Sequence, residues 1–429
     1  MRRLTGLLGW PDPRQVITSG IIVLLAFLYA AFYLLPLVAP HAPRADDFQD
    51  YLFAARQLTT GGDPYANFIR IHVPWDWSLS SGYLYPPLFA ALLIPLTWLP
   101  GDLAVRLWLF LMQFCIVGSL LIVYRQIGRP SRGELIALGA VLLTFFPLIN
   151  SAATGAMNAI LLLLLTCAWA YWLRHRDVTS GMLAGLAAVM KLFPLALMPY
   201  LAWRRHWRLL TALGLTTVAG LALGFVITRV DHNIYYFRDM LPHLAIGTGY
   251  RENQSLAGFT ARLCNPSTAD AGGNAGWCGR LLDWPLVAGV IGLVLYETSR
   301  LSRSGLEFAL AIAALPLISS VTWSFHLVLL ILPITLLIRR LLSGDLSRTA
   351  GRWLVVAWLC FSVGPAIHYL LIVHPLARLP GLADLIPFTL TRVLGESYFI
   401  GTVVILGSLW DATRRQRRIQ QTADVTLAA

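Results

Sequence analysis

Apolar runs of roughly 14 to 24 residues recur along the whole chain, and a helix of about 20 such residues crosses the core of a bilayer. Three of these runs, Val16–Ala39, Leu103–Tyr124 and Trp353–Val373, carry few or no charges. Of the 429 residues, 57% are hydrophobic and 13% charged, which is more apolar surface than a water-soluble domain hides in one core. The sequence therefore predicts an all-α, polytopic integral membrane protein of about twelve spanning helices, with the first run retained rather than cleaved as a signal peptide.

The net charge of +12 is explained by where the basic residues fall. We place the N-terminus in the cytoplasm and let each apolar run cross the membrane once. Two segments are treated differently: residues 85–100 form a hairpin on the membrane surface, and residues 180–203 enter the membrane and return to the same side. All compact basic clusters then lie inside: Arg2/Arg3, Arg125–Arg132, Arg174/Arg176, Arg204–Arg208, Arg300/Arg303, Arg339–Arg352 and Arg414–Arg418. This positive-inside pattern predicts that both termini are cytoplasmic, and it favours contact with membrane lipid over nucleic-acid binding.

Two stretches are longer than the other connections, and both fall outside in this topology. We expect one membrane domain over residues 1–412, with a first outer loop at 41–101 that contains juxtamembrane helices and a second outer loop at 230–282. Residues 413–429 form a cytoplasmic basic tail in this interpretation. The apolar 86–100 segment is too short and too rich in proline for an ordinary span, so we expect it to lie flat on the membrane.

The cysteines divide according to compartment. Cys264 and Cys278 fall in the second outer loop, where an oxidising environment allows either a disulfide or two free thiols. Cys115, Cys167 and Cys360 fall inside apolar runs, where we expect small apolar side chains.

Lys191, in AGLAAVMKLFP, is the only lysine of the chain. A charge beside an apolar run is costly and needs a reason to be there. A compact ammonium suits a phosphate bound as a point charge, whereas a guanidinium fork needs more room. The simpler alternative is a lysine whose head reaches the membrane surface.

Asp46 and Asp47 follow the first apolar run, in a segment with the spacing of a short amphipathic helix on the bilayer. A carboxylate there is placed to act as general base, taking a proton from an acceptor hydroxyl that attacks the anomeric carbon of a lipid-carried sugar. The alternatives are an ordinary helix N-cap, and a divalent metal bound with Asp50.

His326, with Trp323 before it, begins an apolar run at the same outer level and is either catalytic or an interfacial hydrogen-bonding residue. In the second outer loop, RENQSLAGFTARL contributes Asn253, Gln254 and Arg262, which are donors suited to sugar hydroxyls or a phosphate.

These segments together resemble glycosyltransferase family 87, membrane enzymes of the GT-C superfamily that use polyprenyl-phosphate sugars. The resemblance rests, in order, on DFQDYLFAARQLTTGGDPY, YLYPPLFAALLIPL, TGAMNAILLLLL, GLAAVMKLFPLALMPYLAWRRHWR, NQSLAGFTARL and the segment around His326. It implies an inverting transfer, most simply of mannose, to a hydroxyl of a glycolipid or glycan on the extracytoplasmic face, without a cofactor. No P-loop or dinucleotide-binding motif is present in the sequence.

The resemblance also implies roles for residues. Asp47 matches the acidic base of the first outer loop, with Asp46 as the alternative, and His326 matches a position that supports catalysis or donor binding. The resemblance places Lys191 at the donor phosphate, and we expect Tyr85 and Trp323 beside the donor. TGAMN replaces a Gly-Gln-x-x-Asn pattern, so the glutamine contact is absent and only Asn158 remains.

Two other functions fit the same residues. A transporter or flippase of a lipid-linked sugar would bind the phosphate without reacting, although the two halves of the chain show no inverted repeat. A non-enzymatic subunit of an envelope assembly would use the outer loops for docking.

Overall fold

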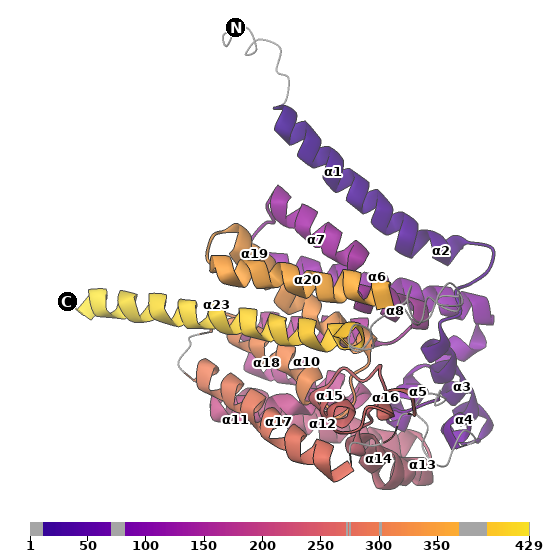
Figure 1. Ribbon diagram of the computed structural model, residues 1–429. Helices are drawn as coiled ribbons and strands as arrows, with labels where there is room; N and C mark the ends of the chain where they lie inside the picture. Colours follow the sequence, from indigo (N-terminus) through magenta and orange to yellow (C-terminus); the bar gives the residue numbers. More distant parts are fainter. Residues whose placement is uncertain are drawn as a thin grey trace.

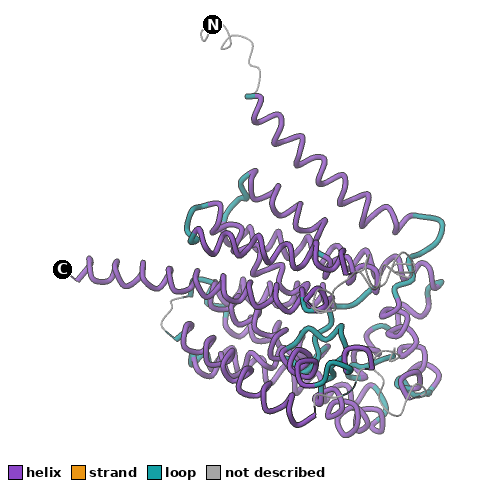
Figure 2. Tube along the Cα trace, viewed as in Figure 1, coloured by secondary structure: helices purple, strands orange, loops and turns teal. Residues whose placement is uncertain are grey.

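The computed structural model describes residues 12–69, 82–271, 273, 276–299, 303–368 and 393–428. Every regular element in these ranges is helical, and Figure 2 shows no strand there. Six candidate membrane spans are long and apolar enough to cross: α1 (Pro13–Tyr29) running through η1 (Ala30–Leu34) into α2 (Leu35–Val38), α6 (Gly101–Ile127), α12 (Trp207–Ile227), α17 (Gly276–Thr298), η5 (Ser324–Leu330) running into α19 (Ile331–Leu342), and α20 (Arg348–His368).

Other apolar helices in the described part of the chain are bent or shorter. The pair α7 (Arg132–Thr144) and α8 (Phe146–Thr154) meets at 51° and makes a seventh candidate span. The shorter ones are α9 (Asn158–Leu173), α10 (Asp177–Met190), η3 (Phe193–Leu197) with α11 (Met198–Trp203), and α18 (Leu306–Ile318). The chain is therefore an α-helical membrane protein, as predicted, whereas the number of about twelve crossings stays a prediction.

The remaining helices are short, except for the last one. They are α3 (Asp46–Thr60), α4 (Ala66–Ile69), α5 (Pro87–Leu92), η2 (Ile94–Trp98), α13 (Val230–Tyr235), η4 (Tyr236–Met240), α14 (Leu241–Ile246), α15 (Leu256–Cys264), α16 (Thr268–Ala271) and finally α23 (Ser397–Ala428). Helix α23 runs on through most of the predicted basic tail and extends beyond the bundle in Figure 1. Helix α17 begins at Gly276, inside the range predicted for the second outer loop.

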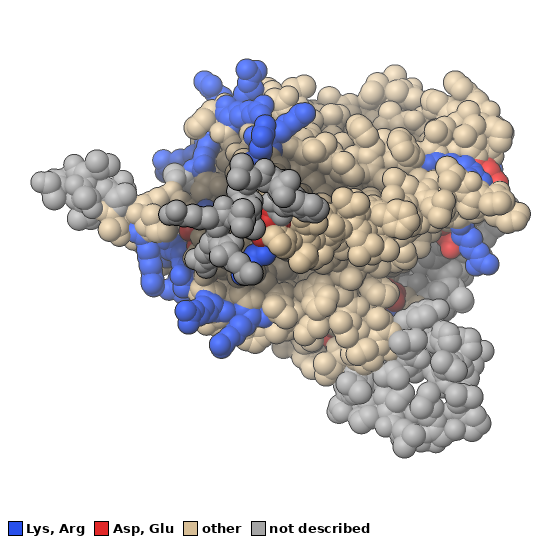
Figure 3. Space-filling model, turned by 90° about the horizontal axis from the view of Figure 1, so that it is seen from above, with Lys and Arg blue, Asp and Glu red and all other residues tan. Residues whose placement is uncertain are grey.

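The two ends of the bundle differ in structure and in charge. In Figure 1 the short helices α3, α4, α13 and α14 gather at the right, whereas the α19–α20 connection and the end of α23 lie at the left. Figure 3 is turned about the horizontal axis, so its left and right sides are the same as in Figure 1. Most of the visible Lys and Arg side chains gather at its left end. We call the right end the loop end and the left end the basic end.

Helix α3 packs its apolar face on protein rather than presenting it to lipid, and its expected position at the membrane surface stays a prediction. Its apolar face is buried, and the ring of Phe48 stacks on Trp108 with 4.9 Å between centroids. The 86–100 segment is also partly covered, because Pro87 to Ala90 are buried, while Trp98 is 76% exposed. Amphipathic spacing shows which face of a short helix is apolar, but it does not say whether lipid or protein covers that face.

Helices α10 and α11 form a hairpin, in agreement with the predicted entering and returning segment. Arg303 contacts Asp177 at the start of α10, at 2.7 Å, and His206 just after α11, at 3.4 Å. Because α10 begins and α11 ends beside the same arginine, the chain runs away from this point and returns to it. Lys191, which follows the last residue of α10, lies at the far turn of the hairpin.

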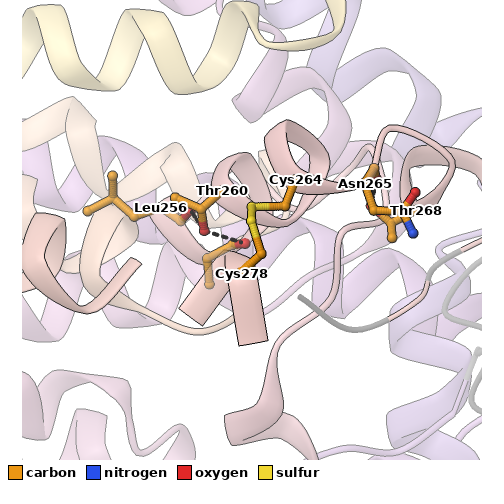
Figure 4. Close-up of a disulfide and its surroundings, with 7 residues drawn as sticks. Leu256, Thr260, Cys264, Asn265, Thr268 and Cys278 are labelled. Atoms are coloured by element: carbon orange, nitrogen blue, oxygen red, sulfur yellow. Dashed lines mark hydrogen bonds between the residues drawn. A yellow bond between two sulfur atoms is a disulfide. The ribbon is translucent and has the colours of Figure 1, made fainter. Parts of the chain in front are cut away.

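The predicted second outer loop is held together covalently and by charge. Cys264, at the end of α15, is joined to Cys278 in α17 by a disulfide (Figure 4). Arg262 on α15 makes a bidentate ion pair with Glu396, at 2.6 Å for both bonds. The loop is thereby fixed to α17 on one side and to the start of α23 on the other.

Candidate active site

Lys191 and His326 meet although 135 residues separate them in the chain, with Nζ 2.5 Å from Nε2. Helix α10 ends at Met190, and Lys191 adopts an extended backbone that turns its side chain away from the helical path. His326 lies in the first turn of the 3₁₀ helix η5, where its Nδ1 accepts the backbone N–H of Trp323 at 3.1 Å. Two interruptions of helical structure, one after α10 and one before η5, therefore position the pair.

The Lys191–His326 pair consists of two basic groups without an acid in direct contact. Both contacting atoms are nitrogen, and no carboxylate of the described residues forms an ion pair with the Lys191 ammonium. Its other neighbours are aromatic, with the ring centroid of Tyr85 at 5.6 Å and that of Phe193 at 5.9 Å. A buried amine beside aromatic rings, without an ion-pair partner among the described residues, favours an anion that would stabilise its charged form.

A cavity of about 320 Å³ opens beside this pair. Its walls come from residues 84–85, the hairpin turn, the segment 236–245 and the stretch before η5, and they are mainly apolar. We call it the Lys191 cavity; Lys191, His326, Tyr85, Trp323 and Tyr236 are among its lining residues. An apolar cavity with one cationic point suits a lipid chain that carries a single phosphate.

Asp47 lies in the first turn of α3 and is half-buried, whereas Asp46 beside it is exposed. Burial raises the pKa of the Asp47 carboxyl to about 7; the charges of Asp50 and Asp46 add to the increase, and Lys191 opposes it. Lys191 therefore lies within electrostatic reach of Asp47, although Asp47 is not among the residues that line the Lys191 cavity. A carboxyl that titrates close to neutrality is suited to general base catalysis.

Asp50, one turn further along α3, supports the first outer loop. Its Oδ2 accepts the backbone N–H of Gly82 at 2.8 Å. Burial raises the pKa of Asp50 to about 6, and the Gly82 hydrogen bond opposes this increase. In the described part of the chain, no group of three His, Cys, Asp or Glu side chains is close enough together to hold a metal ion. Asp46, Asp47 and Asp50 therefore do not form such a group.

Tyr85 joins the two parts of the site. Its hydroxyl lies 3.2 Å from that of Tyr51 on α3, and its ring faces Lys191. Burial raises the pKa of Tyr85, and the Asp47 carboxylate adds to the increase, so the tyrosine adjoins both Asp47 and Lys191. Sequence reasoning missed Tyr51 and Tyr236, although Tyr51 follows Asp47 by one helical turn and therefore shares its face of α3.

Gly155 is a third residue that sequence reasoning missed. It ends α8 with φ of 69°, and a Cβ there would lie 3.0 Å from the Cβ atoms of Ala45 and Phe48. Trp108 Nε1 donates to the Gly155 carbonyl at 2.7 Å. The glycine of TGAMN thus allows the start of α3 to approach α8 closely, and a helix-ending glycine in the sequence was the available signal.

Asn158 is buried at the start of α9, and its Oδ1 has no hydrogen-bond partner among the described residues. It is not among the residues that line the Lys191 cavity. Its expected contact with the donor therefore stays a prediction that the geometry does not strengthen.

The donors of the second outer loop are used within the protein. Asn253 donates to the carbonyls of Thr248 and Ser320, and Gln254 donates to those of Arg251 and Gly395. Arg262 donates hydrogen bonds to three backbone carbonyls in addition to its ion pair with Glu396. The structure does not bring Asn253, Gln254 or Arg262 to the Lys191 cavity; buried polar groups with partners of this kind fix the shape of a loop.

The structure therefore defines a class of protein: a helical membrane protein whose loop end joins a half-buried acid, an aromatic residue and an uncompensated lysine beside an apolar cavity. The chain belongs to glycosyltransferase family 87, whose family model matches residues 83–320. The predicted family is thus confirmed, and the chain is a glycosyltransferase.

Two relatives from Mycobacterium tuberculosis are similar over most of the chain. The polyprenol-phosphate-mannose-dependent alpha-(1-2)-phosphatidylinositol mannoside mannosyltransferase is 29% identical over 67% of this chain and 68% of its own length. The corresponding phosphatidylinositol pentamannoside mannosyltransferase is 27% identical over 84% of this chain and 80% of its own length. Among solved structures, apo ArnT from Cupriavidus metallidurans has a TM-score of 0.41 and 16% identity, covering 94% of this chain and 78% of that one.

Proposed function

We propose that this protein is an inverting glycosyltransferase that moves a sugar, most simply mannose, from a polyprenyl-phosphate donor to a hydroxyl of a glycolipid or glycan acceptor. The observation that carries the proposal is the convergence of Tyr85, Lys191 and His326 at one apolar cavity, with the Asp47 carboxyl within electrostatic reach of Lys191. The names of the mycobacterial relatives support mannose as the sugar and a phosphatidylinositol mannoside as the kind of acceptor.

The proposed reaction needs one base and one anion clamp. The acceptor oxygen forms a bond to the anomeric carbon as the bond from that carbon to the phosphate oxygen breaks, which inverts the configuration. The electron pair leaves with the polyprenyl phosphate, and the acceptor proton passes to the Asp47 carboxylate. Lys191, with His326 beside it, stabilises the charge that grows on the leaving phosphate.

The membrane arrangement belongs to the same proposal. We place the loop end and its cavity on the extracytoplasmic face and both termini in the cytoplasm, in a GT-C fold of about twelve crossings. The gathering of arginines at the basic end and the disulfide at the loop end support this orientation. In Arg238→Cys, an impermeant maleimide should label intact cells, whereas in Ser343→Cys it should not.

The activity is tested with purified protein in liposomes that contain labelled polyprenyl-phosphate mannose and a short-chain phosphatidylinositol mannoside. We expect a mannosylated product whose new bond has the anomeric configuration opposite to that of the donor. Polyprenyl-phosphate glucose, assayed in parallel, tests the sugar. Labelled donor that crosses the bilayer without forming product would instead identify a transporter and refute the enzyme proposal for these substrates.

A further inference from the structure

A second cavity of about 550 Å³ lies next to the Lys191 cavity. The turn that begins η5 separates them: Trp323 and His326 line the first cavity, and Ser324, between them, lines the second. The other walls come from α8, the second outer loop and the start of α23. We call it the Ser324 cavity. Its position places it on the opposite side of the catalytic turn from the proposed donor phosphate.

The lining of the Ser324 cavity differs in chemistry from that of the Lys191 cavity. It offers the aromatic side chains of Tyr250 and Tyr398, together with Asn150 and Ser324, which share a hydrogen bond of 2.6 Å. Flat apolar rings beside hydroxyl and amide groups match the two faces and the rim of a sugar ring.

The charges of the Ser324 cavity are of both signs. Arg251 and Glu252 are neighbours in the chain and both line it. The Lys191 cavity, in contrast, is lined by the basic residues Lys191 and His326 and by no acid of the described residues. A mixed pair gives no net preference for an anion, so this lining suits an uncharged polyhydroxyl ligand better than a phosphate.

One buried polar group in the Ser324 cavity lacks a partner. The side-chain oxygen of Ser397, a residue only 5% exposed, has no hydrogen-bond partner among the described residues. A buried hydroxyl normally finds a partner, because leaving it without one is costly. A ligand hydroxyl in the cavity would supply that bond.

The walls of the Ser324 cavity are held in place before any ligand arrives. Gln254 donates to the carbonyls of Arg251 and Gly395 at 2.7 and 3.1 Å, and its Oε1 accepts the backbone N–H of Phe399 at 2.9 Å. The Arg262–Glu396 ion pair connects the same two segments. These residues, expected to grip a ligand, act instead as positioning residues for the cavity wall.

We propose that the Ser324 cavity binds the glycan headgroup of the acceptor, with Ser397, Asn150 and the two tyrosines contacting its sugar rings. This inference rests on the proposed transfer reaction, which requires an acceptor hydroxyl to reach the anomeric carbon from the side opposite the leaving phosphate. The cavity recognises the glycan itself, whether the glycan is attached to a lipid or free.

The test fills the cavity with Ser397→Leu and uses Ser408→Leu as a matched control. Ser408 lies on the same helix, about 16 Å further along its axis, and its buried hydroxyl is likewise without a partner among the described residues in another cavity, near Asp411 and Arg415. Initial rates are measured with a short-chain phosphatidylinositol mannoside and with its deacylated glycan. Glu252→Gln serves as a second variant, since it keeps the shape of this cavity-lining residue and replaces a carboxylate acceptor of sugar hydroxyls by a weaker amide.

We expect Ser397→Leu to raise the KM for both acceptors about tenfold and Glu252→Gln to raise it severalfold, with the donor KM unchanged and Ser408→Leu like the wild type. An increase for the lipid-linked acceptor only, an increase in the donor KM, or no change with either acceptor would overturn the proposal.

Binding separates this inference from the proposed function. The deacylated glycan is titrated into each protein in nanodiscs without donor, so no turnover is needed. We expect the wild type and Ser408→Leu to bind it and Ser397→Leu to bind about tenfold more weakly. If the wild type binds the glycan but forms no product, the transfer proposal fails and the cavity assignment stands. If the wild type does not bind it, the cavity assignment fails.

Discussion

The two ends of the α10–α11 hairpin carry buried or half-buried charges, but only one end balances them. At the basic end, Arg303 donates to both carboxylate oxygens of Asp177, at 2.7 and 2.9 Å, and to the Trp172 carbonyl at 2.8 Å. At the loop end, Lys191 meets the His326 ring and aromatic faces. One hairpin thus presents a closed ion pair at one end and, at the other, an amine without an ion-pair partner among the described residues.

This difference separates structural from functional charge. A bidentate arginine–carboxylate pair satisfies both partners and leaves little to offer a ligand. The loop-end amine and the nearby Asp47 have strongly perturbed surroundings without forming a salt bridge with each other among the described residues. Such arrangements cost stability and are retained where a substrate completes them.

Asp47→Asn should have the largest effect on activity. The amide keeps the shape of the side chain but cannot accept the acceptor proton, so we expect kcat to fall about 1000-fold. Transfer of labelled mannose by purified protein measures it, and thermal unfolding checks that the fold persists. Asp46→Asn is the matched control because that neighbour is exposed, and it should stay within about threefold of the wild type. A larger loss in Asp46→Asn than in Asp47→Asn would move the base to Asp46.

Lys191→Met should follow in size. Methionine keeps the length of the side chain and removes the charge, so the growing phosphate charge loses its clamp and kcat/KM for the donor should fall about 100-fold. The melting temperature should not fall, because an uncompensated ammonium is removed from an apolar site. Loss of stability with retained activity would mean that Lys191 has the structural role assigned to Arg303.

Arg303→Met tests the opposite tip. Both members of the Arg303–Asp177 pair are 18% exposed, and removing the arginine leaves the carboxylate unpaired. We expect about 2 kcal/mol of destabilisation, seen as a lower melting temperature in detergent, while the folded fraction keeps kcat within about threefold. Arg303→Met should thus lower stability but not activity, whereas Lys191→Met should lower activity but not stability.

The sequence was sufficient to predict the helical membrane class, the family, and the hairpin with Lys191 at its turn. These rest on local signals: long apolar runs, clustered arginines, a solitary lysine and a proline-rich break. The pairing of Lys191 with His326 was expected only through the family resemblance, because 135 residues separate them. Periodicity does not encode which helices become neighbours.

Other features were out of reach of the sequence for a physical reason. Arg262 had the residue type of a phosphate ligand, but its partner Glu396 lies 134 residues away and could not be inferred. Helix α3 has the same apolar face whether lipid or protein covers it, so its burial against Trp108 was missed. In both cases the residue type was informative, and the tertiary partner decided the role.

Asp50→Asn should give the smallest effect, a shift of the pH profile. As a base, Asp47 must be ionised, so kcat should fall as the pH decreases through about 7, the value to which burial and its neighbours raise the pKa of this carboxyl. The negative charge of Asp50 contributes to that increase. Removing it should lower the pKa of Asp47 and shift the acid limb of the profile to lower pH by up to about one unit.

The control for this shift is Asp102→Asn, which changes net charge equally at an exposed residue that is not among the charges acting on Asp47. Its profile of kcat against pH should coincide with that of the wild type. Asparagine at position 50 still accepts the Gly82 N–H, so loop geometry is kept and the shift reports charge alone. An acid limb that moves to higher pH in Asp50→Asn, or does not move, would mean that the group titrating near neutrality is not Asp47. Another acid at the loop end would then have to act as the base beside Lys191.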